Sequence, residues 1–135
     1  MTQRTLVLIK PDAVRRGLVG NVLSRFESKG LTLVALEQRH IDGEAADRHY
    51  AEHVERDFYP PLRAFVTSGP MVALVLEGDE AIEVVRAING ATDGRKAAPG
   101  TIRGDLSLSN RENLVHGSDS PESADREIAL WFPHL

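Results

Sequence analysis

The segment NLVHGSDS, residues 113–120, decides the fold at the C-terminal end of the chain, because a strand ends and a helix begins within it. The apolar run at 114–116 predicts a short strand that stops on a histidine. Ser120 is a favoured N-cap residue and Pro121 suits the first helical position, so a helix is expected to follow and to run through Trp131. The chain therefore closes with a short strand and a helix, joined by small polar residues.

Working back from this segment, hydrophobic periodicity predicts the other regular elements. Gly30 and Gly90 are placed to end two of the helices. A polar, helical insertion at 43–66, interrupted by Pro60 and Pro61, separates two strand–helix–strand halves. We expect strands at 5–9, 31–38 and 71–78, helices at 17–29 and 79–89, and a glycine-rich loop at 91–110.

This order of elements favours an α+β sandwich of the ferredoxin-like kind, a βαββαβ arrangement in which an antiparallel sheet carries its helices on one face. The helical insertion and the C-terminal helix are additions to that core. At 135 residues the whole chain, 1–135, is predicted to form a single domain. RNA-recognition modules and small regulatory domains share the same order, so function has to be argued from particular residues.

Composition and charge exclude several classes of function. The chain has no cysteine, which rules out disulfides, thiolate nucleophiles and cysteine-ligated zinc. Its formal net charge of −4 argues against broad binding to nucleic acid or to an anionic membrane. The first apolar run, 6–9, is too short for a signal peptide or a membrane span, so a cytoplasmic location is expected.

His116 has the setting of a nucleophile, because a strand end holds it and Gly117 leaves its ring accessible. Glu127 lies about two turns into the following helix, where its carboxylate could fix the tautomer of the imidazole and stabilise a positive charge. Ser118 could bridge the two side chains. The alternatives are a satisfied histidine in the core or at its rim, and a glutamate on a solvated helix face.

A second group of candidates is cationic or carries a hydroxyl. Lys10 ends the first strand and Arg86 lies late in the helix at 79–89. Thr92 and Arg103 come from the segment after that helix. Each could be an ordinary surface residue, but element ends that converge would form a side-chain cradle for a polyphosphate. The P-loop pattern GxxxxGK[ST] is absent.

Three other patterns have simpler explanations. His49 and His53 have zinc-ligand spacing, but no third ligand is evident and we expect them on a polar helix face. The Arg-Gly-Asp tripeptide at 103–105 has no adhesive partner in a chain without a secretory signal. Phe58 and Tyr59 could pack in the core or offer a platform for a base.

Three motifs together resemble the nucleoside diphosphate kinase family. They are Lys-Pro-Asp at 10–12, Pro-Gly-Thr-Ile-Arg-Gly-Asp at 99–105 and the segment 113–120, within a similarity that runs from the first strand to Trp131 and Phe132. The resemblance implies a ping-pong exchange of a γ-phosphoryl group. His116 would attack a nucleoside triphosphate, become phosphohistidine, and return the group to a second diphosphate.

The same resemblance implies roles for Glu127 and Ser118 in orienting the histidine, and for further residues around it. Phe58 would stack on the base, opposite an apolar residue near Leu108. Mg²⁺ would bridge phosphate oxygens, held mainly by the nucleotide and without a protein ligand. The residues implied to hold the phosphates and the sugar are Lys10, Tyr50, Arg86, Thr92, Arg103 and Asn113.

Stacking reads no base edge, so such a site should accept purines and pyrimidines, and ribose and deoxyribose. The resemblance also implies a homo-oligomer, with a hexamer favoured and a tetramer possible. The chain departs from the family where Asp57 and Gly94 replace prolines. Glycine adds backbone freedom, so the long loop is expected to be softer.

Two other classes of function compete with the kinase. A nucleic-acid-binding module on this architecture needs aromatic and basic residues on a central strand, and MVALVLEG at 71–78 has neither. A small regulatory domain that binds a ligand without chemistry explains the fold but leaves the histidine motif unused. The kinase is therefore the preferred interpretation.

Overall fold

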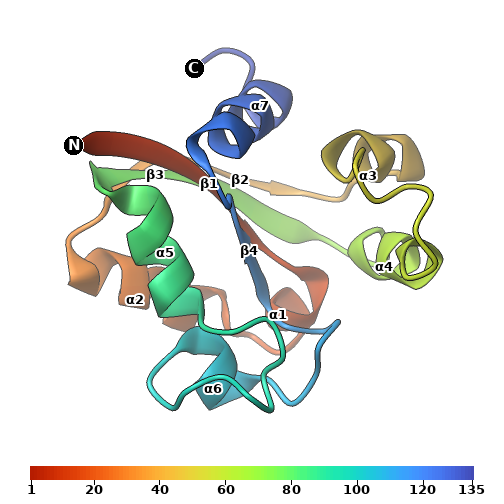
Figure 1. Cartoon of the computed structure of the whole chain (residues 1–135), viewed down its shortest axis with the longest axis horizontal. Coiled ribbons are helices and arrows are strands. Elements are labelled where there is room, and N and C mark those ends of the chain that lie inside the picture. The colour runs from red at the N-terminus through yellow and green to blue at the C-terminus, as the bar shows by residue number, and fades with distance from the viewer.

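The computed structural model, which describes residues 1–135, contains four strands and seven helices (Figure 1). No helix is both long enough and apolar enough to cross a membrane. In chain order the elements are β1 (Thr2–Ile9), α1 (Pro11–Arg15), α2 (Val19–Lys29), β2 (Thr32–Arg39), α3 (Gly43–His49), α4 (Tyr59–Val66), β3 (Met71–Asp79), α5 (Ala81–Asn89), α6 (Ile102–Leu106), β4 (Val115–Gly117) and α7 (Pro121–Trp131).

The strands form one antiparallel sheet in the order β2-β3-β1-β4. β1 and β3 pair along their whole length, with Ile9 opposite Val72 at one end. β4 is an edge strand that pairs with the last part of β1, with Leu8 opposite His116. The predicted α+β fold of the ferredoxin-like kind is confirmed.

Helices cover both faces of this sheet. α2 and α5 pack on one face, over a core that includes Val7 and Leu74. α3, α4 and α7 cover the other face, where Leu8 and Trp131 are buried. Figure 1 shows α7 on the opposite side of the sheet from α2 and α5. The prediction of helices on one face is therefore right for the two helices of the βαβ halves and wrong for the molecule, because the insertion and the C-terminal helix fill the second face.

Covering both faces explains the pattern of the first strand. Residues 6–9 are all apolar and at most 1% exposed, although alternate side chains of a strand point in opposite directions. Val7 and Ile9 belong to one core, and Leu6 and Leu8 belong to the other. The continuous apolar run in the sequence is thus the mark of a strand that is buried on both sides.

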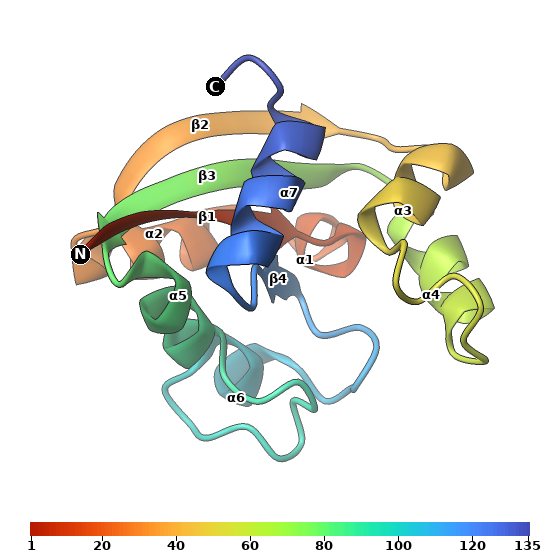
Figure 2. The ribbon, with the colours of Figure 1, turned by 45° about the horizontal axis from the view of Figure 1, so that its top comes forward.

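Two short helices are absent from the sequence-based expectations. α1 is the first, and it begins at Pro11, which suits the first helical position. Because α1 precedes it, the predicted helix at 17–29 starts later than expected, at Val19. α6 lies inside the predicted loop at 91–110 (Figure 2). The side chain of Thr101 accepts a hydrogen bond from the N–H of Gly104 at its start. Both helices are too short for hydrophobic periodicity to mark them.

Two predicted boundaries also move. Asp79 ends β3 instead of opening a helix, and Glu80, with a φ of 51°, turns the chain so that α5 begins at Ala81. Pro60 and Pro61 do not interrupt a helix. They lie in the first turn of α4, where their missing N–H groups break no helical hydrogen bond.

Candidate functional site

His116 lies on β4, at the edge of the sheet. A backbone hydrogen bond of 3.1 Å from the N–H of Ser118 to the carbonyl of Leu6 fixes the register of β4 against β1. Successive residues of an antiparallel strand point their backbone groups in opposite directions, so Val115 and Gly117 direct theirs away from β1. On this outer edge the backbone of Val115 is already engaged, because its N–H donates to the carbonyl of Asn113 at 2.8 Å and its carbonyl accepts from Arg103 at 2.6 Å.

The backbone just before β4 is strained at Leu114. Its φ is 74°, in the left-handed region that costs a non-glycine residue about 1–2 kcal/mol. The side chain is fully buried, and the N–H donates to Oδ2 of Asp12 at 3.2 Å. Burial raises the pKa of Asp12 above its usual value. Strain of this kind persists only where the surrounding structure holds it, and it is common at functional sites.

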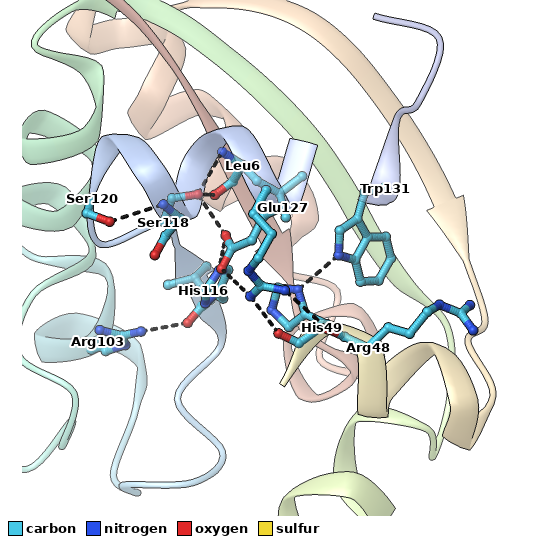
Figure 3. Close-up of polar contacts among 12 residues, drawn as sticks. Leu6, Arg48, His49, Arg103, His116, Ser118, Ser120, Glu127 and Trp131 are labelled. Carbon is cyan, nitrogen blue, oxygen red and sulfur yellow. Dashed lines mark hydrogen bonds and ion pairs between the residues drawn. The ribbon is translucent and has the colours of Figure 1, made fainter. Parts of the chain in front are cut away.

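Three side chains form a hydrogen-bonded chain at His116 (Figure 3). Its Nε2 lies 2.9 Å from Oε1 of Glu127, and Ser118 Oγ donates to the same oxygen at 2.7 Å. Burial alone would raise the pKa of Glu127, but the hydrogen bonds and charge of His116 hold that pKa below its usual value. A carboxylate only accepts, so Nε2 carries the proton and Nδ1 is the ring nitrogen left for a ligand.

Arg103 is fixed by backbone carbonyls and not by a carboxylate. From α6 its guanidinium donates to the carbonyls of Asn113 at 3.1 Å, Gly90 at 2.9 Å and Val115 at 2.6 Å. Burial, together with the charge of Arg86, lowers the pKa of Arg103 to about 10. Carbonyl partners orient the guanidinium without neutralising it, so its charge is available to an anion.

Lys10 is a second buried cation, and its Nζ donates to Oδ1 of Asn113 at 3.0 Å. Burial lowers the pKa of Lys10 to about 8, and the charge of Arg103 acts in the same direction. Asn113 in turn donates to the carbonyls of Asn110 at 2.8 Å and Thr92 at 3.2 Å. A desolvated ammonium without a carboxylate partner is stabilised when an anion arrives.

These groups line one open, mainly polar pocket of about 380 Å³. The hydroxyl of Tyr50 is buried there without a hydrogen-bond partner, and burial raises its pKa. Arg86 and Thr92 lie exposed at the rim. Ser118 stands behind the pocket, on Glu127. The structure thus brings together the residues predicted to hold phosphate, sugar and histidine: Lys10, Tyr50, Arg86, Thr92, Arg103, Asn113, His116 and Glu127.

A second cleft of about 560 Å³ adjoins the first, and Lys10, Thr92 and His116 line both. Phe58 and Leu108 lie in this second cleft and are 50% and 86% exposed. Two exposed apolar side chains therefore lie in one open cleft, whose other lining residues are mostly polar.

Gly94 is held more tightly than its residue type suggests. Its N–H donates to the carbonyl of Ser109 at 3.1 Å, and a Cβ there would lie 2.3 Å from the carbonyl oxygen of Ser107. Neither an alanine nor a proline fits this loop conformation without a shift of the chain. The greater softness of the loop stays a prediction.

The sequence-based expectation is wrong for His49. We expected it on a polar face, but it is buried, and its ring centroid lies 4.8 Å from that of His116. Its Nδ1 accepts a hydrogen bond of 3.0 Å from Nε1 of Trp131. The physical reason is that α3 packs against α7, which turns this helix face inward. His53 lies farther out and lines the second cleft beside Phe58.

His49, His116 and Glu127 hold candidate metal-ligand atoms within 4.8 Å of one another. His49 Nδ1 and Glu127 Oε1 already have partners, in Trp131 and in His116 with Ser118. Mg²⁺ prefers oxygen ligands in octahedral geometry. Two imidazoles and one engaged carboxylate do not fit that preference.

Asn89 is a pocket residue that nothing in the sequence marked. It ends α5, is buried beside Gly117, and its Oδ1 has no hydrogen-bond partner. A Cβ at Gly117 would lie 3.0 Å from Nδ2 of Asn89. A polar residue at the end of a helix is ordinary in a sequence, so only the tertiary structure distinguishes it.

Comparison with known proteins agrees with this geometry. The family model described as nucleoside diphosphate kinase matches residues 3–135. A protein named nucleoside diphosphate kinase from a Nocardioides species is 76% identical over 135 residues, which is 100% of both chains. Another of that name, from Mycobacteroides abscessus, is 65% identical over 136 residues and covers 100% of both chains.

Solved structures agree as well. A halophilic nucleoside diphosphate kinase from Halobacterium salinarum in complex with CDP has a TM-score of 0.95 and 48% identity, over 98% of this chain and 88% of that one. The nucleoside diphosphate kinase of Aquifex aeolicus has a TM-score of 0.94 and 44% identity, over 98% of this chain and 96% of that one. Because the family model spans nearly the whole sequence and relatives match it end to end, this chain belongs to the nucleoside diphosphate kinase family.

Proposed function

We propose that His116 carries the phosphoryl group in a nucleoside diphosphate kinase reaction. Its Nδ1 attacks the γ-phosphorus of a nucleoside triphosphate, and an N–P bond forms while the bond from phosphorus to the β–γ bridging oxygen breaks. The diphosphate leaves, and the terminal oxygen of a second diphosphate takes the group back. The observation that carries this proposal is the 2.9 Å contact of Nε2 with Glu127, which leaves Nδ1 free in a cationic pocket.

Glu127 and Ser118 orient this histidine. The carboxylate keeps the proton on Nε2, so Nδ1 holds a lone pair, and it balances the positive charge that the ring gains on phosphorylation. Ser118 in turn fixes the carboxylate, and the N–H of Leu6 donates to Ser118 Oγ at 3.2 Å. The lowered pKa of Glu127, due to its hydrogen bonds with His116 and Ser118, keeps it charged at neutral pH.

The cationic residues stabilise the charge of the transferring group. Lys10 and Arg103 are held in place by Asn113 and by backbone carbonyls, so little reorganisation is needed when negative charge spreads over the phosphoryl oxygens. Mg²⁺, bound mainly through the nucleotide's own phosphates, would neutralise part of the phosphate charge. The remaining side chains proposed to contact phosphates or sugar are Tyr50, Arg86, Thr92 and Asn113.

Broad base and sugar tolerance fits the second cleft. Phe58 and Leu108 are apolar, exposed and able to sandwich any base by its face. A site that grips phosphates but only stacks the base discriminates weakly among bases. We therefore expect purine and pyrimidine nucleotides, with ribose or deoxyribose, to be substrates.

A phosphoenzyme assay tests the role of His116. The protein is incubated with γ-labelled ATP and Mg²⁺, and we expect an acid-labile phosphoenzyme that GDP or dTDP discharges. His116→Gln should form none. His134→Gln, which removes an exposed histidine far from the pocket, is the matched control and should label normally. Turnover by His116→Gln at the wild-type rate would show the proposal to be wrong.

The competing nucleic-acid-binding module has little support. Such a module stacks bases on an open sheet face. The central strands β1 and β3 are instead covered by helices on both sides, as their side chains in the two cores demonstrate. The remaining alternative is a ligand-binding domain without chemistry. It does not explain why Glu127 is hydrogen-bonded to both His116 and Ser118, an arrangement that orients one imidazole.

Assembly and location stay predictions. The exposed Leu33 and Leu36 on the edge strand β2 support a homo-oligomer, because an apolar edge is commonly covered by another subunit. A hexamer is favoured over a tetramer, and light scattering would distinguish six copies of the 14.8 kDa chain from four. The cytoplasmic location rests on the sequence alone.

A further inference from the structure

His49 lies among three aromatic neighbours, and the mechanism above gives it no part. Its ring centroid is 4.6 Å from Tyr50, 4.8 Å from His116 and 5.7 Å from Trp131, and the interplanar angles are 88°, 82° and 79°. Edge-to-face contacts on three sides fix the plane of the His49 ring. Tyr50 and Trp131 therefore restrain the ring against which His116 packs.

The hydrogen bond from Trp131 determines the tautomer of His49. An indole N–H can only donate, so Nδ1 accepts and the proton of the neutral ring is on Nε2. Burial lowers the pKa of His49 to about 3, and the charges of His116 and Arg126 act in the same direction. Arg126 also donates to the backbone carbonyl of His49 at 3.0 Å, so α7 holds both the ring and the backbone.

We propose that His49 is a positioning residue for His116. Its uncharged ring, anchored by Trp131, holds the imidazole of His116 so that Nδ1 faces the pocket while Nε2 stays on Glu127. This inference rests on the proposed role of His116 as the phosphoryl carrier.

Packing adds a restraint that the hydrogen bond to Glu127 does not supply. That bond fixes one atom of the His116 ring, whereas the contact with His49 limits rotation of the whole ring about its Cβ–Cγ bond. Phosphoryl transfer needs the nucleophile in line with the leaving oxygen. A displacement of the reacting nitrogen by about 1 Å costs on the order of a hundredfold in rate.

Two other roles for His49 do not fit. A metal ligand needs a free lone pair, but Nδ1 accepts from Trp131 and Nε2 carries the proton. A general base needs to bind a proton near neutral pH, and burial, which lowers the pKa of His49 to about 3, prevents that. The His49 ring therefore acts on His116 through its shape and its lack of charge.

Two substitutions separate these properties. His49→Phe keeps a neutral ring against His116 but leaves the N–H of Trp131 without an acceptor. His49→Asn keeps an acceptor near the position of Nδ1 but removes the ring. Because His49→Phe leaves that buried N–H unpaired, we expect its Tm to fall by about 5 °C.

The readout is the single-turnover rate of His116 phosphorylation by saturating ATP and Mg²⁺, measured by rapid quench on variants shown to be folded at the assay temperature. We expect His49→Asn to be at least about tenfold slower with KM for ATP little changed, since only alignment is lost. His49→Phe should restore the rate to within about threefold of wild type, although it is the less hydrogen-bonded protein.

The rate is measured across pH, because several charged groups surround His116. They are Glu127 and Arg126 of α7, Asp119 after β4, Arg86 of α5, Arg103 of α6, Lys10 after β1 and Glu52 after α3. None changes in these variants, so we expect the midpoint of the pH–rate profile of His49→Phe to match that of wild type. A shifted midpoint would mean that His49 acts through charge and would overturn the proposal.

A purely structural role gives a different pattern, in which every folded variant phosphorylates at the wild-type rate. That result, or a His49→Phe variant as slow as His49→Asn, would also overturn the proposal. Failure of the underlying function is distinguishable, because it would appear as phosphoenzyme in His116→Gln. His134→Ala controls for the loss of a histidine elsewhere.

Discussion

The two ends of the nucleotide pocket are built in different ways. At the phosphoryl end the side chains of His116 and Glu127 are 20% and 7% exposed, and hydrogen bonds link them to each other and to Ser118. At the base end Phe58 and Leu108 are largely exposed and have no polar partner. Hydrogen-bonded placement is found where the proposed chemistry is the same for every nucleotide, and exposed apolar side chains where the proposed substrates would differ.

Charge follows the same division. Lys10 and Arg103 are buried at the phosphoryl end, and desolvation lowers their pKa values to about 8 and about 10. Neither has a carboxylate partner within hydrogen-bond distance. At the base end Arg95 is paired with Asp93 at 2.8 Å, and this pairing lowers the pKa of Asp93 to about 2. Only the phosphoryl end keeps buried positive charge ready for an anion.

The largest effect is expected from breaking the rigid end at Glu127. Glu127→Ala removes the acceptor for His116 and Ser118, and we expect the rate of phosphoenzyme formation to fall about a hundredfold. Glu127→Gln keeps an oxygen acceptor without the charge and should lose about tenfold. Rapid-quench measurement of single turnover gives both rates.

The two Glu127 variants should affect all nucleotides alike, since the phosphoryl end does not contact the base. A loss in Glu127→Ala that is large for ATP and small for dTTP would contradict the division between the two ends. Glu122→Ala, on the exposed first turn of the same helix, is the matched control and should retain the wild-type rate.

A smaller effect is expected at the base end. Phe58→Ala removes the stacking face, and we expect KM to rise about tenfold for both purine and pyrimidine diphosphates, with kcat little changed. Steady-state kinetics with ADP, CDP and dTDP measure this. Val54→Ala, another exposed apolar residue nearby in the sequence, should leave KM unchanged. A rise confined to one base would indicate that the second cleft reads base edges.

The same contrast explains what the sequence could predict. The short strand at His116, the helix that carries Glu127 and the N-cap at Ser120 are local signals, because periodicity and capping act within a few residues. The predicted strand at 114–116 is one residue out of place, since β4 runs from Val115 to Gly117 and Leu114 has a left-handed backbone. The first strand and the helix ended by Gly30 were predicted for the same reason. That Lys10 and Arg103 lie in one pocket was harder to predict, because their proximity depends on tertiary structure. The family resemblance provided that prediction.

The misplaced residues depend on contacts that no local pattern encodes. His49 reads as part of a polar helix, and only the packing of α3 on α7 places it against His116. Asn89 became a buried, unpaired amide only because α5 packs beside Gly117. Helices on both faces of the sheet were missed because the insertion looked polar, while a few residues such as Val66 supply its apolar side.

A third prediction uses pH to remove the positive charge of Lys10 at the phosphoryl end. Burial lowers the pKa of Lys10 from 10.5 to about 8, so in the free enzyme its charge is lost as pH rises through about 8. We expect KM for nucleoside diphosphates to rise severalfold between pH 7 and pH 9. Lys10→Arg, whose charge does not titrate in this range, should flatten that dependence.

The same shift changes stability in the opposite direction. Between pH 8 and pH 10.5 the unfolded chain binds more protons at Lys10 than the folded chain does, so this residue makes the free energy of unfolding rise with pH in that window. Urea denaturation of the nucleotide-free protein measures this free energy, with Lys10→Met as the non-titrating reference.

The KM experiment has its own contradicting outcome. A KM for nucleoside diphosphates that is constant from pH 7 to pH 9 would show that Lys10 does not bind phosphate as the charged form.

The smallest expected effect concerns Asn89, whose buried Oδ1 shares the pocket with the Tyr50 hydroxyl and, like it, has no hydrogen-bond partner. Asn89→Leu keeps the branched shape and the number of side-chain heavy atoms and removes a buried acceptor without a partner, so we expect the free energy of unfolding to rise by about 1 kcal/mol. Asn89→Asp should lower it, because a carboxylate there would be buried without a cation. Urea denaturation and Tm give both signs. If Asn89→Leu is instead no more stable and phosphorylates more than tenfold slower, its Nδ2 donates to the phosphoryl group beside Gly117, and the rigid end extends to α5.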